Sequence, residues 1–204
     1  MNAWAVATVL LAGAAATSAQ TLEITPMGGY RLGGSFTIEG ATSDLAVKDS
    51  GAFGIHLGVK VADDGEIEAL FSRQDTKLKS DTGLFTSILL FPIRLDTYQL
   101  GGSYLFGEGD AKLRPYIGLG LGVTRLVPEP DYFEAETRFS ASIAGGVKAY
   151  VGPHLGFRLE VRGFFTVIDS ESRIFCTPGL PCVVTTKGSD ISQAEIRGGL
   201  IFRF

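Results

Sequence analysis

Apolar and polar residues alternate with a period of two along most of the chain after residue 20. This alternation is typical of β-strands that have one apolar and one polar face. No window of helical length carries a convincing apolar stripe at the 3.6-residue period of a helix. The alternation predicts eight strands, at roughly residues 21–36, 51–62, 66–77, 93–107, 112–126, 137–151, 155–168 and 191–204.

The connections between these predicted strands alternate in length. The short connections lie at 62–65, 107–110 and 152–154, and the long ones at 37–50, 78–92, 127–136 and 169–190. Asp-Gly and Gly-Asp pairs in the short connections suit the positive φ of tight hairpins. Short turns at one end and long loops at the other are the plan of a membrane barrel. The sequence therefore predicts an all-β fold, an eight-stranded antiparallel up-and-down transmembrane β-barrel with its termini at the short-turn, periplasmic end.

The predicted strands have two chemically different faces. In the last strand, one face carries Ala194, Ile196, Gly198, Leu200, Phe202 and Phe204, and the other carries Gln193, Glu195, Arg197 and Arg203. A soluble, lipocalin-type barrel would turn the apolar face inward, whereas a membrane barrel would turn it towards lipid. Aromatic residues towards the strand ends and charges of both signs on the polar face favour the membrane barrel.

Composition narrows the class of protein further. Hydrophobic residues make up 45% of the chain and charged residues 20%, yet no apolar run of the about 20 residues that a spanning helix needs follows the N-terminus. The net charge of −4 disfavours a nucleic-acid partner, which requires a basic surplus to neutralise phosphates.

Residues 1–19 have the pattern of a signal peptide, and the barrel domain is expected to span 20–204. Residues 6–16 form an apolar core, and the small residues at 17–19 suit cleavage before Gln20. The preceding residues 1–4 lack the Lys or Arg that such peptides usually carry. An N-terminal membrane anchor is the alternative, but the apolar core is too short for one.

Three segments carry a resemblance to a known family. The sequence ends in GLIFRF at 199–204, and YQLGGSY and RPYIGLGLG occur at 98–104 and 114–122. These segments resemble strands of the OmpA-like, or outer membrane protein β-barrel domain, superfamily. The resemblance implies a place in the bacterial outer membrane, with membrane lipid and lipopolysaccharide around the barrel. It also implies that Phe204, with Phe202 beside it, is the signal that the barrel-assembly machinery reads.

Charged residues at polar-face positions are the most distinctive candidate site. They are Glu23, Arg31, His56, Lys60, Glu66, Glu68, Arg114, Arg138, Lys148, Arg158, Glu160, Arg162, Glu195, Arg197 and Arg203. They form either a narrow, anion-preferring pore or a network of ion pairs that fills the barrel. The network is favoured because the interior of eight strands is only wide enough for side chains. The excess of cations in the set nevertheless indicates water or bound anions inside.

The cysteines and histidines suggest no catalytic or metal site. Cys176 and Cys182 lie in the fourth long loop, where the oxidising compartment favours a disulfide, and no further His or Cys lies nearby to complete a zinc site. Two positions after His56 the residue is Gly58, and two positions after His154 it is Gly156. The His-x-Ser pair of a barrel lipid A deacylase is therefore missing. We therefore predict no enzyme, no cofactor and no metal.

Two functions from different classes remain open. The first is a structural or porin-like role in the cell envelope, without catalysis. The second is an adhesin that binds a surface ligand through its long loops. The apolar segment 84–91 in the second loop is either an extension of the strands or a contact surface.

Overall fold

The computed structural model describes residues 21–37, 44–81, 87–108, 111–129, 135–167, 173–174, 184–185 and 190–204. All the regular structure in these segments is β-strand, and they contain no helix long and apolar enough to cross a membrane. The signal-peptide prediction for residues 1–19 and the two cysteines fall outside the described residues.

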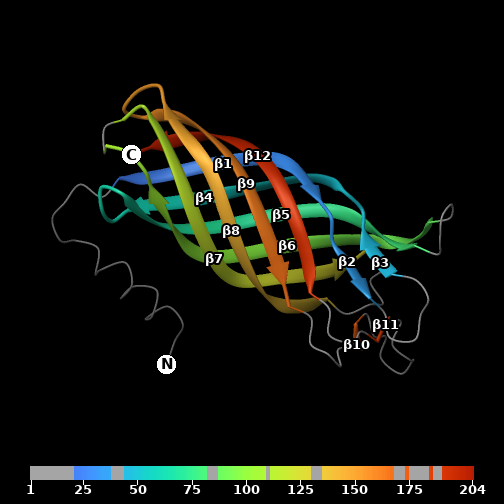
Figure 1. Cartoon of the computed structure of the whole chain (residues 1–204). Coiled ribbons are helices and arrows are strands. Elements are labelled where there is room, and N and C mark those ends of the chain that lie inside the picture. The colour runs from blue at the N-terminus through green and yellow to red at the C-terminus, as the bar shows by residue number, and fades with distance from the viewer. Residues whose placement is uncertain are drawn as a thin grey trace, which may run out of the picture.

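Eight antiparallel strands form a closed barrel (Figure 1). They are β1 (Leu22–Leu32), β4 (Ser50–Lys60), β5 (Gly65–Asp81), β6 (Ser87–Leu105), β7 (Leu113–Pro128), β8 (Glu136–Tyr150), β9 (Leu155–Thr166) and β12 (Ile191–Arg203). The first and last strands pair with each other, with Glu23 opposite Arg203 and Arg31 opposite Glu195. Each strand therefore has a partner on both sides, which confirms the predicted up-and-down barrel.

Four short strands lie outside this set of eight. They are β2 (Ser35–Thr37), β3 (Asp44–Val47), β10 (Arg173–Ile174) and β11 (Val184–Thr185). β2 and β3 pair with each other, and β3 also pairs with the outer part of β5. A single strand was predicted over 21–36, but Gly33 and Gly34 interrupt it with φ angles of 79° and 111°. Few residues other than glycine adopt such angles, so the chain bends here and β2 begins as a separate strand.

The β5–β6 hairpin is longer than the sequence pattern indicated. β5 has 17 residues and β6 has 19, so both strands run into the segment 78–92 that was expected to be a loop. β1, by comparison, has 11 residues. The expected loop contains inward-facing Leu78, which is only 1% exposed, and this burial favours continued strand pairing.

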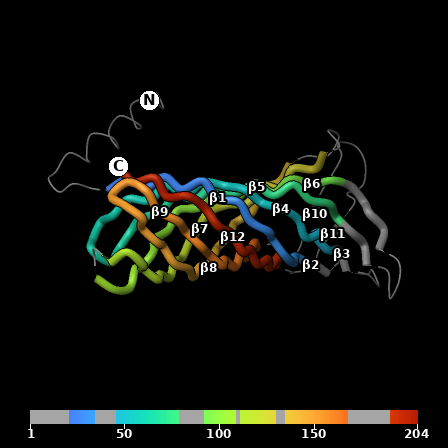
Figure 2. Tube along the Cα trace, turned by 90° about the horizontal axis from the view of Figure 1, so that it is seen from above, coloured from blue at the N-terminus to red at the C-terminus, as the bar shows by residue number. Residues whose placement is uncertain are grey.

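The short turns and long connections lie at opposite ends of the barrel. Figures 1 and 2 show the turns after β4 and β8 near the C-terminus, and β2, β3, β10 and β11 at the far end. In an outer-membrane barrel the short turns face the periplasm and the long loops face outward. We refer to the two ends accordingly as periplasmic and extracellular.

The apolar faces point out of the barrel. On β12, Ile196 is 61% exposed, whereas its neighbours Glu195 and Arg197 are 1% and 3% exposed. The same alternation runs along β7 and β9. An apolar exterior around a charged interior is the arrangement of a membrane barrel and the reverse of a lipocalin-type barrel, so the soluble alternative is wrong.

Candidate functional site

The inward faces of β1, β4, β5, β7, β8, β9 and β12 bring buried charges together inside the barrel. Side chains two residues apart on a strand share a face, so the alternating sequence of β9 places Arg158, Glu160 and Arg162 inside in succession. The register then places Glu160 beside Arg197 of β12 and Arg158 beside Lys148 of β8.

Glu160 is the centre of the largest cluster of ion pairs. Its carboxylate accepts hydrogen bonds from Arg158 Nη2 at 2.7 Å, Arg162 Nε at 2.7 Å and Arg197 Nε at 2.8 Å. The hydroxyl of Tyr116 donates a further hydrogen bond to it at 2.5 Å. The Glu160 side chain is 0% exposed, so these donors replace water around its charge.

This cluster extends across the barrel to β1, β4 and β5. Arg158 also binds both carboxylate oxygens of Glu68, at 2.7 and 3.2 Å. Arg197 Nη2 lies 2.7 Å from His56 Nε2, and the other ring nitrogen of His56 lies 3.6 Å from Glu68. On the extracellular side, Arg31 donates to Glu195 at 2.8 Å and to Ser72 at 2.7 Å.

A second cluster lies nearer the periplasmic end, around Glu23. Lys148 Nζ donates to Glu23 at 2.8 Å and also to Glu66. Arg203 Nη2 and the hydroxyl of Tyr150 donate to the other oxygen of Glu23, at 2.8 and 2.9 Å. Together the two clusters join most of the barrel wall by hydrogen bonds across the interior.

The remaining predicted members lie apart from these clusters. Arg114 donates to main-chain oxygens of Asp63 and Gly107, at 2.8 and 3.3 Å. Lys60 pairs with Asp63 at 3.3 Å, and its side chain is 30% exposed. Arg138 pairs with Glu136 at 2.5 Å and is 21% exposed. These positions follow the predicted face but lie towards the barrel ends. Water partly reaches Lys60 and Arg138, whereas Arg114 is only 3% exposed.

The buried charges inside the barrel are nearly balanced. The inward carboxylates are Glu23, Glu66, Glu68, Glu160 and Glu195, and the inward buried cations are Arg31, Arg114, Lys148, Arg158, Arg162 and Arg197. Arg114, the one cation in excess, is bound to carbonyl oxygens. Among these fully buried groups the surplus of cations is therefore one, while Arg203, which pairs with Glu23 and is 29% exposed, adds a cation that water partly reaches.

Sequence reasoning missed the uncharged members of the network. Gln99 donates to Ser140 at 3.2 Å and accepts from Ser142 at 2.6 Å, and Ser142 in turn accepts from Arg162 at 2.8 Å. Gly120 leaves room for this chain, because a Cβ there would lie 2.9 Å from Ser142 Oγ. Strand parity counted from Arg114 would have placed Tyr116 inside as well.

The interior also holds an apolar layer, which was not expected on the polar face. Val47, Leu78, Ile93, Leu95, Leu126 and Ile191 occupy inward positions near the extracellular end, and each is 5% exposed or less. Leu95 and Leu126 are opposite each other across β6 and β7. These apolar side chains occupy the interior on the extracellular side of the ion pairs.

Neither histidine lies in an arrangement that suits catalysis. His56 is 1% exposed, with Arg197 Nη2 2.7 Å from its Nε2, and its Nδ1 lies 3.6 Å from Glu68, beyond hydrogen-bond distance. His154 lies in the periplasmic turn before β9, where Nδ1 is 3.0 Å from the main-chain oxygen of Arg203. In the part of the chain that the structure describes, no three His, Cys, Asp or Glu side chains gather as metal ligands.

The two residues of the predicted assembly signal lie on the outer face. Phe202 is 39% exposed and Phe204 is 71% exposed. The main chain of Phe204 also exchanges hydrogen bonds with Leu22, at 2.9 and 3.2 Å, and so helps to close the barrel. The outward position leaves the aromatic ring accessible to lipid or to another protein.

Comparison with known proteins agrees with this architecture. The family model described as "Outer membrane protein beta-barrel domain" matches residues 5–204. No significant match is found among curated protein sequences.

Solved outer-membrane proteins share the fold at low sequence identity. OprG from Pseudomonas aeruginosa aligns with a TM-score of 0.62 and 16% identity, over 91% of this chain and 96% of its own. AlkL, solved in lipid bilayers, gives a TM-score of 0.60 and 14% identity, over 93% and 94% of the two chains. Neisserial surface protein A gives 0.54 and 13%, over 92% and 98%. With the family match over nearly the whole sequence, the chain belongs to the outer membrane protein β-barrel domain family and is located in the bacterial outer membrane.

Proposed function

We propose that this protein is a structural, non-catalytic component of the outer membrane, with a barrel closed by its own side chains. The observation that supports this proposal is the network around Glu160, in which three arginines and a tyrosine converge on one carboxylate in the middle of the interior. An eight-stranded barrel has little interior space beyond its side chains. A permeating ion would have to break hydrogen bonds between these buried charged groups. Each buried charge left without a partner costs several kcal/mol.

The porin-like alternative is tested by conductance in planar bilayers. The refolded wild-type barrel is expected to give no steady openings. The double variant Arg158→Ala/Glu160→Ala removes the middle of the network and should give small, reproducible openings. The matched double variant Lys60→Ala/Asp63→Ala removes an exposed pair at the periplasmic turn and should stay silent. Steady ohmic conductance in the wild-type protein would contradict the closed-barrel proposal.

An adhesin role is the second candidate, and the length of the β5–β6 hairpin favours it. A tilted strand needs about 9–11 residues to cross the hydrocarbon, so strands of 17 and 19 residues extend well past the membrane. The extension gives other molecules a surface that stands away from the lipid. Cells that display the full chain should then bind host cells better than cells that display a variant lacking residues 79–89. Equal binding by the two strains would argue against an adhesin that uses this hairpin.

A further inference from the structure

In the described part of the barrel wall, the charged residues that face outward gather in one patch. At the outward positions of the eight barrel strands whose side chains are described, the charged residues are Arg73, Asp75 and Lys77 on β5, Arg94 and Asp96 on β6, and Arg125 on β7. We call these six residues the outer patch. All lie towards the extracellular end, on three adjacent strands.

The strand register arranges the centre of the outer patch in a row across the wall. Arg73 of β5 lies opposite Asp96 of β6, which lies opposite Arg125 of β7. Arg73 donates to both oxygens of Asp96, at 2.6 and 3.2 Å, and Arg94 Nε lies 3.3 Å from Asp96. Two arginines therefore share one carboxylate, which leaves their combined charge only half neutralised.

The outer patch carries a positive charge on a chain whose net charge is −4. Its cations, Arg73, Lys77, Arg94 and Arg125, outnumber the carboxylates of Asp75 and Asp96. Arg125 is exposed, and it has no ion pair within the described part of the chain. The patch thus presents spare guanidinium donors at the outer edge of the lipid-facing surface.

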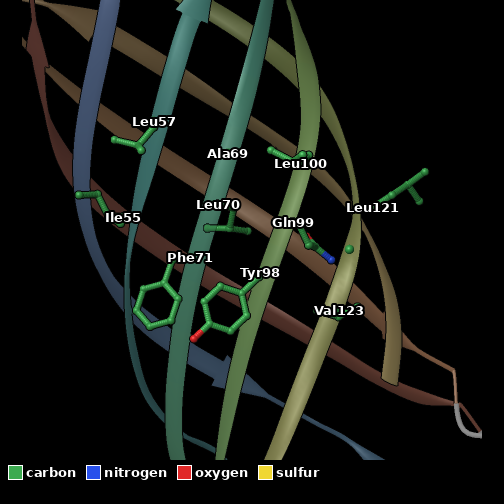
Figure 3. A pocket seen from close by; sticks show the side chains of 11 residues that line it. Ile55, Leu57, Ala69, Leu70, Phe71, Tyr98, Gln99, Leu100, Leu121 and Val123 are labelled. Atoms are coloured by element: carbon green, nitrogen blue, oxygen red, sulfur yellow. The ribbon is translucent and has the colours of Figure 1, made fainter. Parts of the chain in front are cut away.

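An apolar hollow lies next to the outer patch on the same strands, nearer the periplasmic end. Figure 3 shows the side chains that line it. It has a volume of about 450 Å³, and its lining includes Leu57, Ala69, Phe71, Tyr98, Leu100 and Leu121. Phe71 and Tyr98 face each other across β5 and β6, with ring centroids 5.1 Å apart, and Arg73 lies above the Phe71 ring at 5.6 Å. The small side chain of Ala69 leaves space between Leu57 and Leu100, its neighbours across the strands.

We propose that the outer patch and this hollow form a docking site for the phosphorylated glycolipid of the outer leaflet, the lipid A part of lipopolysaccharide. Arginine forms bidentate, charge-assisted hydrogen bonds to phosphate, and Arg94 and Arg125 have donors to spare for them. A lipid headgroup at the level of the outer patch places an acyl chain next to Phe71 and Tyr98, where the hollow receives it. The outer patch and the hollow therefore follow one another along the wall in the same order as the phosphates and the acyl chains of the lipid.

The test measures binding of purified bisphosphorylated lipid A to the exported full-length barrel in detergent, by native mass spectrometry. The variant Arg94→Gln/Arg125→Gln should bind about tenfold more weakly, because two partly exposed charge contacts are lost. The variant Lys112→Gln removes one cation at the periplasmic end and should bind as the wild type does. Dephosphorylated lipid A should also bind weakly to the wild type.

A second pair of variants tests the hollow. Ala69→Phe fills it and should lower lipid A affinity severalfold, whereas Ala194→Phe adds the same ring to an outward position on β12 and should not. Unchanged affinity in Arg94→Gln/Arg125→Gln would overturn the proposal, as would equal binding of phosphorylated and dephosphorylated lipid A. Displacement of the lipid by millimolar inorganic phosphate, with no effect of Ala69→Phe, would indicate a free-phosphate site and would also overturn it.

Discussion

Glu160 is the residue on which most of the buried arginines depend. Arg158, Arg162 and Arg197 all donate to its carboxylate, and Arg197 has a second carboxylate, that of Glu195, no nearer than 3.9 Å. Without Glu160, Arg158 would keep its pair with Glu68, but Arg162 and Arg197 would have no carboxylate nearer than 3.9 Å, so like charges would be buried together with little compensation. Loss of this one carboxylate is therefore expected to lower the stability of the barrel by more than the loss of its own hydrogen bonds would.

Replacement of Glu160 by Ala is expected to lower the free energy of unfolding by about 3–5 kcal/mol, because three buried guanidinium groups lose their shared partner. Urea unfolding of the barrel in detergent micelles measures the change. Asp63→Ala is the matched control, since its side chain is 95% exposed and its pair with Lys60 should contribute no more than about 1 kcal/mol. Similar losses in the two variants would show that burial of the network contributes little.

At the scale of the strand, close approach of neighbouring backbones explains some of the glycines. A Cβ built at Gly54 on β4 would lie 2.3 Å from the main-chain oxygen of Phe71 on β5, whereas one at Gly28 on β1 meets nothing within 4 Å. The former contact is too short for any real side chain, so β4 and β5 would have to separate locally to admit one. The two positions therefore differ in what they tolerate, although both are strand glycines.

We expect Gly54→Ala to destabilise the barrel by about 1–3 kcal/mol, as overpacking does in other cores, and Gly28→Ala to be nearly neutral. The temperature at which the folded band is lost on unheated gels compares the variants directly. If Gly28→Ala lowered that temperature as much as Gly54→Ala does, a general loss of strand flexibility would explain the result better than the contact with Phe71.

The closing strand β12 gives a prediction about assembly. Deletion of Phe204 removes the hydrogen bonds to Leu22 and the exposed aromatic ring that we propose as the assembly signal. The amount of heat-modifiable barrel in outer membranes should fall, and degradation in the periplasm should rise. Phe204→Tyr keeps both the main chain and an aromatic ring, and should assemble normally. Full assembly of the deletion variant would rule out this role for Phe204.

For the whole molecule, period-two alternation was enough to predict the barrel, because each inward charge alternates with an outward apolar residue, as in Glu195, Ile196 and Arg197. Pairing across strands was not predictable. The alternation puts both Glu195 and Glu160 on the same face as Arg197, and only the register of β12 against β9 places Glu160 next to it. A shift of one residue between strands would move every side chain to the other face, and sequence alternation alone does not specify the register.

The outer patch and the length of β5 and β6 were missed for a related reason. Asp96 lies at an outward position but is 4% exposed, because Arg73 and Arg94 bind it from the neighbouring strand and from its own strand. That burial depends on contacts between strands. The loop disulfide between Cys176 and Cys182 lies outside the described residues and remains a prediction, which non-reducing mass spectrometry of the exported protein would test.

The central claim is that the barrel is apolar outside and closed by paired charges inside. Single cysteines at Leu200 and at Ser142, introduced after Cys176 and Cys182 are replaced by Ser, test both halves of this claim in one experiment. Leu200 is 41% exposed on the outer wall, whereas Ser142 is 4% exposed within the network. A label at Leu200 should be quenched by lipid-soluble quenchers and not by aqueous ones, and the cysteine at Ser142 should resist small water-soluble thiol reagents in the folded barrel. Rapid modification at Ser142 would reveal an open aqueous pore, and aqueous quenching at Leu200 would contradict the lipid-facing wall.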